Sequence, residues 1–385
     1  MAKKILIFKV KKFCYDSPFY FADQMAYYFA KMGWEVDVFD SDRQKMQSLD
    51  DYSGRSYDAI VDFNSILPGL DTTENEFYLD TIDGPFYNYI LDHPLYHHDM
   101  IKVNLKNHNI ICVDENHKKY IERWYPNIKK CITMPVAGSA PSSPILWEEK
   151  TTDLLFTGTY TDPSYILDMV HDLGKELEDD ITELIKRQKE DLDKPLEDIF
   201  EEFAKEISSP ASIIRFPLRM HAYFPVDTYI TALVRELAVK ELAQSGQKIT
   251  LAGHGWEKAA FLKGLDNVTI LPPVKFSEQF DLMKDSKIVL NVMPHFKAGC
   301  HDRIFSTMLS NSVSLSDESK YFDDNFTRGK DIATYSIKNL RELPNKVSSL
   351  LSDGKNLKAM AENGRKLCES AHTWEHHCRL LSEYF

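Results

Sequence analysis

The sequence has no regular cysteine pattern and no long apolar run. Its 385 residues include six cysteines, none in a CxxC pair, which excludes a disulfide framework and indicates reduced, buried thiols. The apolar run near the start covers only residues 5–8, too short for the hydrophobic region of a signal peptide, and no later stretch approaches the length of a membrane span. We therefore expect a cytoplasmic protein without an integral membrane segment.

Basic residues are outnumbered by acidic ones. The 46 Lys and Arg stand against 59 Asp and Glu, a net charge of −13, which argues against nucleic acid or an anionic membrane surface as the main partner. A small phosphate-bearing ligand in a local cleft is compatible with this balance. Apolar residues make up 43% and aromatic residues 12%. This composition is typical of a globular chain, and the length suits two domains.

The common glycine-rich nucleotide motifs are missing as well. No GxGxxG follows the first apolar stretch, KILIFKV, and GxxxxGK[ST] occurs nowhere in the chain. A dinucleotide or a P-loop nucleotide needs those glycines so that the backbone can approach the phosphates. An NAD-dependent enzyme and a P-loop enzyme are therefore both disfavoured.

The residues that are present alternate between strand and helix patterns. In the first 135 residues, six short apolar stretches (3–10, 34–40, 57–63, 87–92, 109–114 and 131–136) read as strands, with helical patterns between some of them. The segment GSAPSSP at 138–144 reads as a linker, and a second strand-first unit begins at 153. This alternation predicts an α/β fold of two Rossmann-like domains facing across a cleft.

A highly charged helical stretch interrupts the second unit. Over 162–207, apolar residues recur on one stripe that includes Ile166, Val170, Leu173 and Ile181. We interpret this stretch mainly as solvated helix faces, with a role in recognising an acceptor or a second subunit as the alternative. Further strands are expected at 248–253, 287–293 and 312–317.

Small residues follow three strands of the second unit, at 157–159, 253–256 and 298–303. Parallel sheets bind ligands beyond the carboxyl ends of their strands, and the helix that opens after Gly299 offers backbone amides to an anion. Arg303 adds a charge-assisted contact. These loops suit a nucleotide diphosphate without requiring a metal or another cofactor. The candidate ligand-binding residues in them are Gly158, Thr159, His254, Gly255, Gly299, His301, Asp302 and Arg303.

Longer motifs carry a resemblance to a known family. The first half contains ILDHP and CVDENHKKYIERWYP, and the second contains GHGW, NVMPHFKAGCHDRIFSTMLSNSVSLSDESKYFDDNF and AENGRKLCESAHTW. In these motifs the chain resembles the GT-B glycosyltransferases, in particular their CgeB-like, group 1 branch. The resemblance covers roughly 85–137 and 248–385.

The resemblance implies how the chain divides. The N-terminal domain, 1–150, would hold an acceptor. The C-terminal domain, 151–368, would hold a nucleotide-sugar donor and carry the helical insertion at about 162–245. The last segment, 369–385, would cross back to the N-terminal domain.

One family feature is missing. Many retaining members carry two glutamates eight positions apart near the donor, and here Ala298 and Ser306 occupy those positions. If the donor site is intact, the donor contacts that the two glutamates make in those members must be made here by Asp302, Arg303 and the Ser306 hydroxyl, or by Asp317. This leaves retention or inversion of the sugar open.

The catalytic group is expected after a strand of the acceptor domain. His93 or Asp92 could act as the base near the acceptor hydroxyl, although an Asp-His-Pro triplet is also a common capped turn. Asp16, in the loop after the first strand, is a rival base. We therefore predict a metal-independent glycosyltransferase that moves a sugar from a nucleotide sugar to a sugar, protein or small-molecule acceptor. The alternatives are a nucleotide-sugar epimerase and a non-catalytic binding protein of the same fold.

Overall fold

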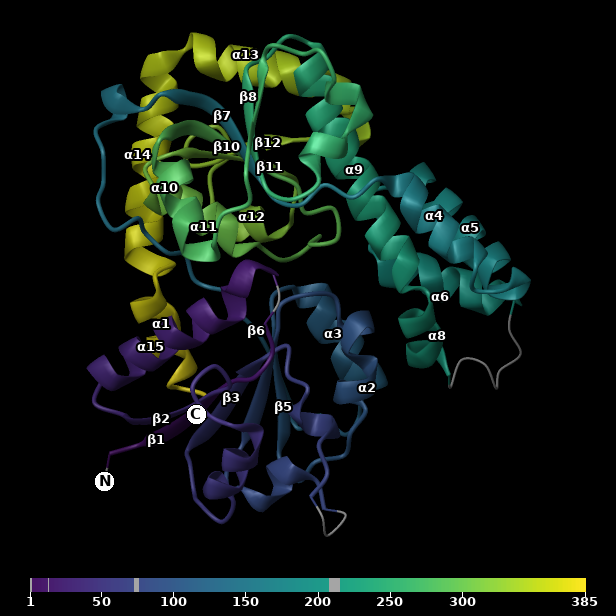
Figure 1. The fold of residues 1–385 in the computed structure, drawn as a ribbon, viewed down its shortest axis with the longest axis vertical. Coiled ribbons are helices and arrows are strands. Elements are labelled where there is room, and N and C mark those ends of the chain that lie inside the picture. Colours follow the sequence, from purple (N-terminus) through teal and green to yellow (C-terminus); the bar gives the residue numbers. More distant parts are fainter. Residues whose placement is uncertain (1, 13, 73–75, 208–214) are drawn as a thin grey trace. The chain divides into compact units, whose positions relative to one another are not determined.

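The computed structural model describes residues 2–12, 14–72, 76–207 and 215–385 (Figure 1). The chain divides into two compact units. Unit 1 is Met1–Ala137 together with Thr373–Phe385, and unit 2 is Gly138–His372. Each unit holds a six-stranded sheet in which the paired strands are parallel, which confirms the predicted α/β class. Within the described residues, no helix is both long and apolar enough to span a membrane.

The sheet of unit 1 contains all six strands predicted in the first half of the sequence. Its order is β2-β1-β3-β4-β5-β6, so successive strands are added on one side of β1 and then, from β3 onward, on the other. We call the position between β1 and β3 the strand reversal of unit 1. Such a reversal leaves a crevice at the carboxyl ends of the two strands. The strands are β1 (Lys4–Lys9), β2 (Glu35–Asp40), β3 (Ala59–Phe63), β4 (Phe86–Ile90), β5 (His108–Cys112) and β6 (Lys130–Thr133). The helices are α1 (Ser17–Lys31), α2 (His98–Ile101), α3 (Glu115–Trp124) and α15 (Trp374–Leu381).

The end of the chain packs against the start of unit 1. Helix α1 buries Phe21 and Phe29 on one face, and the Phe21 ring lies 5.7 Å from the Trp374 ring of α15. Lys31 Nζ forms an ion pair with Glu375 at 3.0 Å. Aromatic contacts of this kind contribute about 1 kcal/mol beyond the apolar area that they bury, so α15 is an integral part of unit 1.

Unit 2 repeats the same construction with a different strand order. Its order is β12-β11-β10-β7-β8-β9, so the reversal lies between β7 and β10. The strands are β7 (Thr152–Thr157), β8 (Ile249–Ala252), β9 (Val268–Leu271), β10 (Ser286–Asn291), β11 (Val313–Asp317) and β12 (Ala333–Tyr335). The helices that follow β9 are α10 (Gln279–Lys284), α11 (Asp302–Leu309), α12 (Tyr321–Asn325), α13 (Leu343–Ser352) and α14 (Gly354–Ala371).

The predicted helical insertion separates β7 from β8. Figure 1 shows its first helices standing to one side of the unit-2 sheet, with the long α9 leading back to the sheet. Ile166, Val170 and Ile181 are buried as the stripe predicts, but Leu173 is 45% exposed because α4 has ended before it. The helices are α4 (Pro163–His171), α5 (Lys175–Glu190), α6 (Leu196–Ile207), α8 (Phe216–Ala222) and α9 (Phe224–Gln244).

A buried carboxyl in unit 1 makes stability depend on pH. Asp62 on β3 is 3% exposed and lies in register with Asn88 on β4. Burial raises the pKa of Asp62 to about 7, although hydrogen bonds from Ser65 and the Phe63 N–H oppose the shift. The folded state therefore binds a proton at Asp62 more tightly than the unfolded state does. The contribution of Asp62 to the stability of the folded state is greatest below pH 4 and is lost as the pH rises toward 7.

We expect Asp62→Asn to become progressively more stable than the wild type as the pH rises. The difference should grow by about 1.4 kcal/mol per pH unit between pH 5 and 6.5 and level off above pH 7.5. Urea unfolding at a series of pH values measures it. The exposed Asp51→Asn is the control and should show no such slope. A difference independent of pH would show that Asp62 stays ionised throughout.

Candidate functional site

The loops that leave β7, β8, β10 and β11 lie at the carboxyl edge of the unit-2 sheet. They include the position between β7 and β10, from which the strand order runs outward in both directions. This is the usual ligand position in open parallel sheets. The predicted ligand-binding residues all belong to these loops, to the end of β11 or to the first turns of α11. The structure therefore brings the three small-residue segments to one edge of one sheet.

The loops after β7 and β8 are joined by hydrogen bonds. The Gly158 N–H donates to the Ala252 carbonyl oxygen at 2.9 Å, and the Tyr160 N–H donates to that of His254 at 2.8 Å. The Trp256 indole N–H donates to the Gly158 carbonyl oxygen at 2.8 Å. Much of the polar backbone of these loops is therefore used in holding them together.

Two of the predicted residues carry specific contacts in this region. The Thr159 carbonyl oxygen accepts a hydrogen bond from Arg235 of α9 at 2.6 Å. Gly255 has φ +89°, and a Cβ there would overlap the Tyr160 carbonyl oxygen. Glycine is thus required at position 255 because the two loops approach each other closely. From the sequence alone, this reason could not be told apart from a close approach of the backbone to a phosphate.

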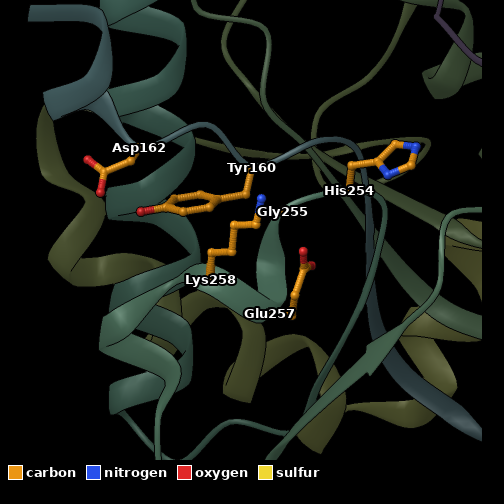
Figure 2. A pocket seen from close by; sticks show the side chains of 6 residues that line it. All are labelled: Tyr160, Asp162, His254, Gly255, Glu257 and Lys258. Atoms are coloured by element: carbon orange, nitrogen blue, oxygen red, sulfur yellow. The ribbon is translucent and has the colours of Figure 1, made fainter. Parts of the chain in front are cut away.

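A pocket of about 290 Å³ opens beside these loops. Figure 2 shows the side chains around it, with Asp162 and His254 at opposite ends of the row. The Tyr160 ring is packed 5.1 Å from Trp256, and its hydroxyl donates to Glu236 at 2.7 Å. Charged groups of both signs surround one aromatic ring. The pocket is lined by Tyr160, Asp162, His254, Gly255, Glu257 and Lys258.

The loop after β10, residues 293–299, is bound to the loop after β11. The Met293 N–H donates to Asp317 Oδ1 at 2.9 Å, and the Ser319 hydroxyl donates to the Gly299 carbonyl oxygen at 2.8 Å. These two loops therefore form one rigid edge next to the strand reversal.

His295 and Lys297 lie within that loop. His295 Nε2 is 3.1 Å from the Asp227 carbonyl oxygen of α9. The Lys297 carbonyl oxygen accepts a hydrogen bond from the Lys320 N–H at 2.9 Å. Burial lowers the pKa of Lys297, against the opposing effect of nearby Asp317. The sequence analysis did not select Lys297, because a single lysine in a loop carries no distinguishing pattern.

Asp317, predicted as a donor-binding residue, lies at the end of β11 and is 1% exposed. Its Oδ2 atom has no hydrogen-bond partner among the described residues. Burial raises the pKa of Asp317 to about 6, opposed by the hydrogen bond from the Met293 N–H and by the charge of Lys297. A buried, incompletely paired carboxyl beside a desolvated lysine is typical of ligand-binding edges rather than of ordinary cores.

Helix α11 starts at this edge with a histidine cap. His301 Nδ1 accepts a hydrogen bond from the Arg303 N–H at 3.2 Å and lies 2.8 Å from Asp302 Oδ1. One of the backbone amides that the sequence analysis expected to bind an anion is thus already occupied. The Arg303 guanidinium donates to Asn291 Oδ1 at 3.0 Å, which orients it toward the end of β10.

Ser306 lies one turn further along α11 and is 1% exposed. Its hydroxyl accepts a hydrogen bond from the Ser139 N–H at 3.0 Å, in the segment predicted as the linker. A Cβ on the preceding Gly138 would lie 2.6 Å from that of Phe305. The middle of α11 therefore anchors the start of unit 2.

In unit 1, Asp92 and His93 follow β4. Asp92 is partly exposed, and its Oδ2 accepts a hydrogen bond from Asn64 at 2.8 Å. His93 is 4% exposed, and its Nδ1 accepts a hydrogen bond from the Leu95 N–H at 3.1 Å. The His93 ring packs 4.6 Å from that of His117, so its position is determined by a turn and by the core.

Asp16 belongs to the loop after β1. It is exposed and precedes α1 with φ +66°, after Cys14 and Tyr15, which also have positive φ. Three consecutive non-glycine residues in the left-handed region cost of order 1 kcal/mol each. This strain is confined to the loop after β1, at the strand reversal of unit 1.

Comparisons with known proteins show what the chain is similar to. Residues 233–383 match the model of the family described as glycosyl transferase-like. The search of curated proteins found no match. These residues cover much of the edge described above, including α11 and the loops after β8, β10 and β11.

Solved structures share the fold at low sequence identity. Sucrose-phosphate synthase from Thermosynechococcus elongatus matches with a TM-score of 0.56 and 10% identity, covering 100% of this chain and 98% of that one. HepE from Anabaena, in complex with UDP and glucose, matches with a TM-score of 0.55 and 11% identity over 100% and 99%. An α-glucosyltransferase in complex with UDP and a 13-mer DNA matches with a TM-score of 0.57 and 12% identity over 100% and 99%.

The predicted resemblance to GT-B glycosyltransferases is therefore confirmed: the fold is the one that these solved structures share, and residues 233–383 match the glycosyl transferase-like family. The CgeB-like branch is compatible with these matches but is not distinguished by them.

Proposed function

We propose that the protein transfers a sugar from a nucleotide sugar, bound at the carboxyl edge of the unit-2 sheet, to an acceptor bound by unit 1. The observation that carries the donor half is the rigid edge formed by the loops after β10 and β11, with Arg303 oriented beside it. It lies within the residues that match the glycosyl transferase-like family. HepE and the α-glucosyltransferase, which share the fold, were both crystallised with UDP.

The same edge supports transfer without a metal. A departing nucleoside diphosphate needs its charge neutralised, and a fixed guanidinium can supply that in place of a divalent cation. Arg303 is oriented by Asn291, whose own amide donates to the Ser316 hydroxyl at 3.0 Å. We infer that this arrangement stabilises the leaving group.

We infer that the pocket beside Tyr160 receives a polyhydroxylated part of a substrate. Carboxylates such as Asp162 and Glu257 accept hydrogen bonds from vicinal hydroxyls, and Lys258 and His254 can donate to them. Hydrogen bonds from Ser164 hold the pKa of Asp162 below its usual value, which keeps it an acceptor.

On the acceptor side we propose Asp92 as the base. It is partly exposed and oriented by Asn64, whereas His93 is nearly buried. Asp16, exposed at the strand reversal of unit 1, is the second candidate. The net charge of −13 supports a sugar, protein or small-molecule acceptor rather than the DNA found with the α-glucosyltransferase.

The test is a thermal-shift screen of UDP-, GDP- and ADP-sugars, followed by analysis of the products. We expect at least one nucleotide sugar to raise the melting temperature, because a ligand that binds only the folded state stabilises it. The donor identified should then release its nucleoside diphosphate when an acceptor is added. Asp92→Asn should keep the thermal shift and lose turnover.

Two outcomes would contradict the proposal. Conversion of the nucleotide sugar to an isomer without any acceptor would indicate an epimerase. A protein that shows no shift with any nucleotide sugar or nucleoside diphosphate would be a binding protein that has lost the donor site.

A further inference from the structure

Lys297 is carried on a rigid part of the donor edge. Hydrogen bonds tie the loop 293–299 to the loop after β11, and one of them is accepted by the Lys297 carbonyl oxygen itself from the Lys320 N–H. The loop leads within six residues to Arg303 on α11. Because its backbone is fixed, the Lys297 side chain projects from a defined point beside the strand reversal of unit 2.

The Lys297 ammonium is left without a partner. Within the part of the chain that the structure describes, Nζ makes no hydrogen bond and no ion pair within 4.0 Å, and the charged groups that act on it do so only through space. The residue is nevertheless partly buried, and burial lowers its pKa. A desolvated and unpaired cation costs free energy, so this arrangement favours any ligand that brings an anionic group to it.

The carboxylates around Lys297 balance its charge from a distance. Asp317 has a buried oxygen without a hydrogen-bond partner, and its charge acts on Lys297. Asp191 and Asp193, in the turn between α5 and α6, also act on it. Both pair with Lys338 at 2.9 Å, which ties the helical insertion to the segment after β12. Lys297 therefore lies in an acidic setting that contains no close ion pair for it.

We infer that Lys297 binds the phosphate-bearing end of the nucleotide-sugar donor through its ammonium, as a substrate-contacting residue separate from Arg303. The inference rests on the proposed function, since it assigns one more residue to the same site. On binding, a phosphoryl oxygen would become the close partner that the ammonium lacks, while the carboxylates of Asp191, Asp193 and Asp317 keep the unliganded site from attracting anions indiscriminately.

The test compares a nucleoside diphosphate with its nucleoside. In titration calorimetry, Lys297→Met should weaken UDP binding by about 10- to 100-fold, because it removes a charge-assisted hydrogen bond, and should leave uridine binding unchanged. Lys297→Arg should restore most of the UDP affinity. Methionine keeps the apolar stem buried, so the variant should unfold at nearly the wild-type temperature. If the wild type prefers GDP or ADP, that diphosphate and its nucleoside replace the uridine pair.

A second set of variants should bind UDP more tightly. Asp191→Asn with Asp193→Asn should tighten UDP binding by about two- to fivefold, because it removes two carboxylates that compete with the phosphate. That gain should shrink when Lys297→Met is added. Lys346→Met, which removes an exposed lysine from α13, is the control and should change neither affinity.

The outcomes separate this inference from the function on which it rests. Equal UDP affinity in the wild type and Lys297→Met would overturn the role of Lys297 and leave the glycosyltransferase proposal standing. Equal losses for UDP and uridine would also overturn it, since they would indicate general damage to the site. A wild type that binds no nucleoside diphosphate or nucleotide sugar would overturn both.

Discussion

Replacing Arg303 with methionine should lower kcat/KM for sugar transfer by about 100-fold or more. The reason is that the guanidinium would no longer neutralise charge on the departing diphosphate, a contribution typically worth about 3 kcal/mol in the transition state. In the structure Arg303 is partly exposed, and one nitrogen is held 3.0 Å from Asn291 Oδ1 at the end of β10. That hydrogen bond directs the group without neutralising its charge.

The expected effect is larger on turnover than on binding. If Arg303 acts mainly on developing charge, kcat should fall more than the affinity for the nucleotide sugar. Initial rates with saturating acceptor, together with calorimetry of the donor, separate the two. Asn291→Ala should give a smaller loss of kcat, since it removes the orienting partner but leaves the cation.

Arg303→Lys is the matched variant because it keeps the charge and loses the forked geometry. A partial recovery of kcat relative to Arg303→Met would show that charge matters more than the second nitrogen. Near-normal turnover and donor binding in Arg303→Met would remove Arg303 from the site altogether. The diphosphate would then have to be held by other groups, with Lys297 the next candidate.

Much of the architecture could be predicted from the sequence because it depends on local patterns. Buried parallel strands are continuous apolar runs, and ten of the twelve strands within the described residues were recognised in this way. The two that were missed, β9 and β12, are short, and the two central residues of β9 are exposed. An edge strand of four residues with an exposed centre has neither the length nor the apolar run that identifies a buried strand.

The site was less predictable because its chemistry depends on contacts between distant segments. Ser306 is a suitable hydroxyl in sequence, but its oxygen accepts a hydrogen bond from Ser139, 167 residues away. The role proposed for Lys297 rests on the lack of a close partner for its ammonium among the described residues, and no local pattern encodes that. Sequence reasoning could therefore predict that the candidate residues lie at one edge of one sheet, while the contacts of each side chain there required the structure.

Even alanine should be poorly tolerated at position 253. A Cβ at this position would overlap the Gly158 carbonyl oxygen and lie 2.7 Å from the carbonyl carbon, and φ is +147°. Neither obstacle is a flexible side chain, so one of the two loops would have to move. We expect Gly253→Ala to lower the free energy of unfolding by about 3 kcal/mol or more, or to prevent folding.

Two other glycines provide the control. Gly246 and Gly264 have φ of +84° and +77°, but a Cβ at either position would meet nothing within 4 Å. Alanine at either position should lower the free energy of unfolding by only about 1 kcal/mol, the cost of the left-handed backbone conformation alone. Urea unfolding of the three variants measures the difference directly. If all three lose the same free energy, the loops after β7 and β8 can separate easily, and the close approach is not what selects glycine at 253.

The comparison also bears on how the motif GHGW is interpreted. A glycine after a strand suggests approach to a phosphate, but here the group that approaches Gly253 is the backbone of Gly158, which also accepts the Trp256 indole N–H at 2.8 Å. A loss of activity in Gly253→Ala would therefore be expected to follow the loss of folded protein. Affinity for the nucleoside diphosphate alone, measured on the folded fraction at low temperature, should stay close to that of the wild type, because the diphosphate contacts proposed here lie on the loops after β10 and β11 and on α11.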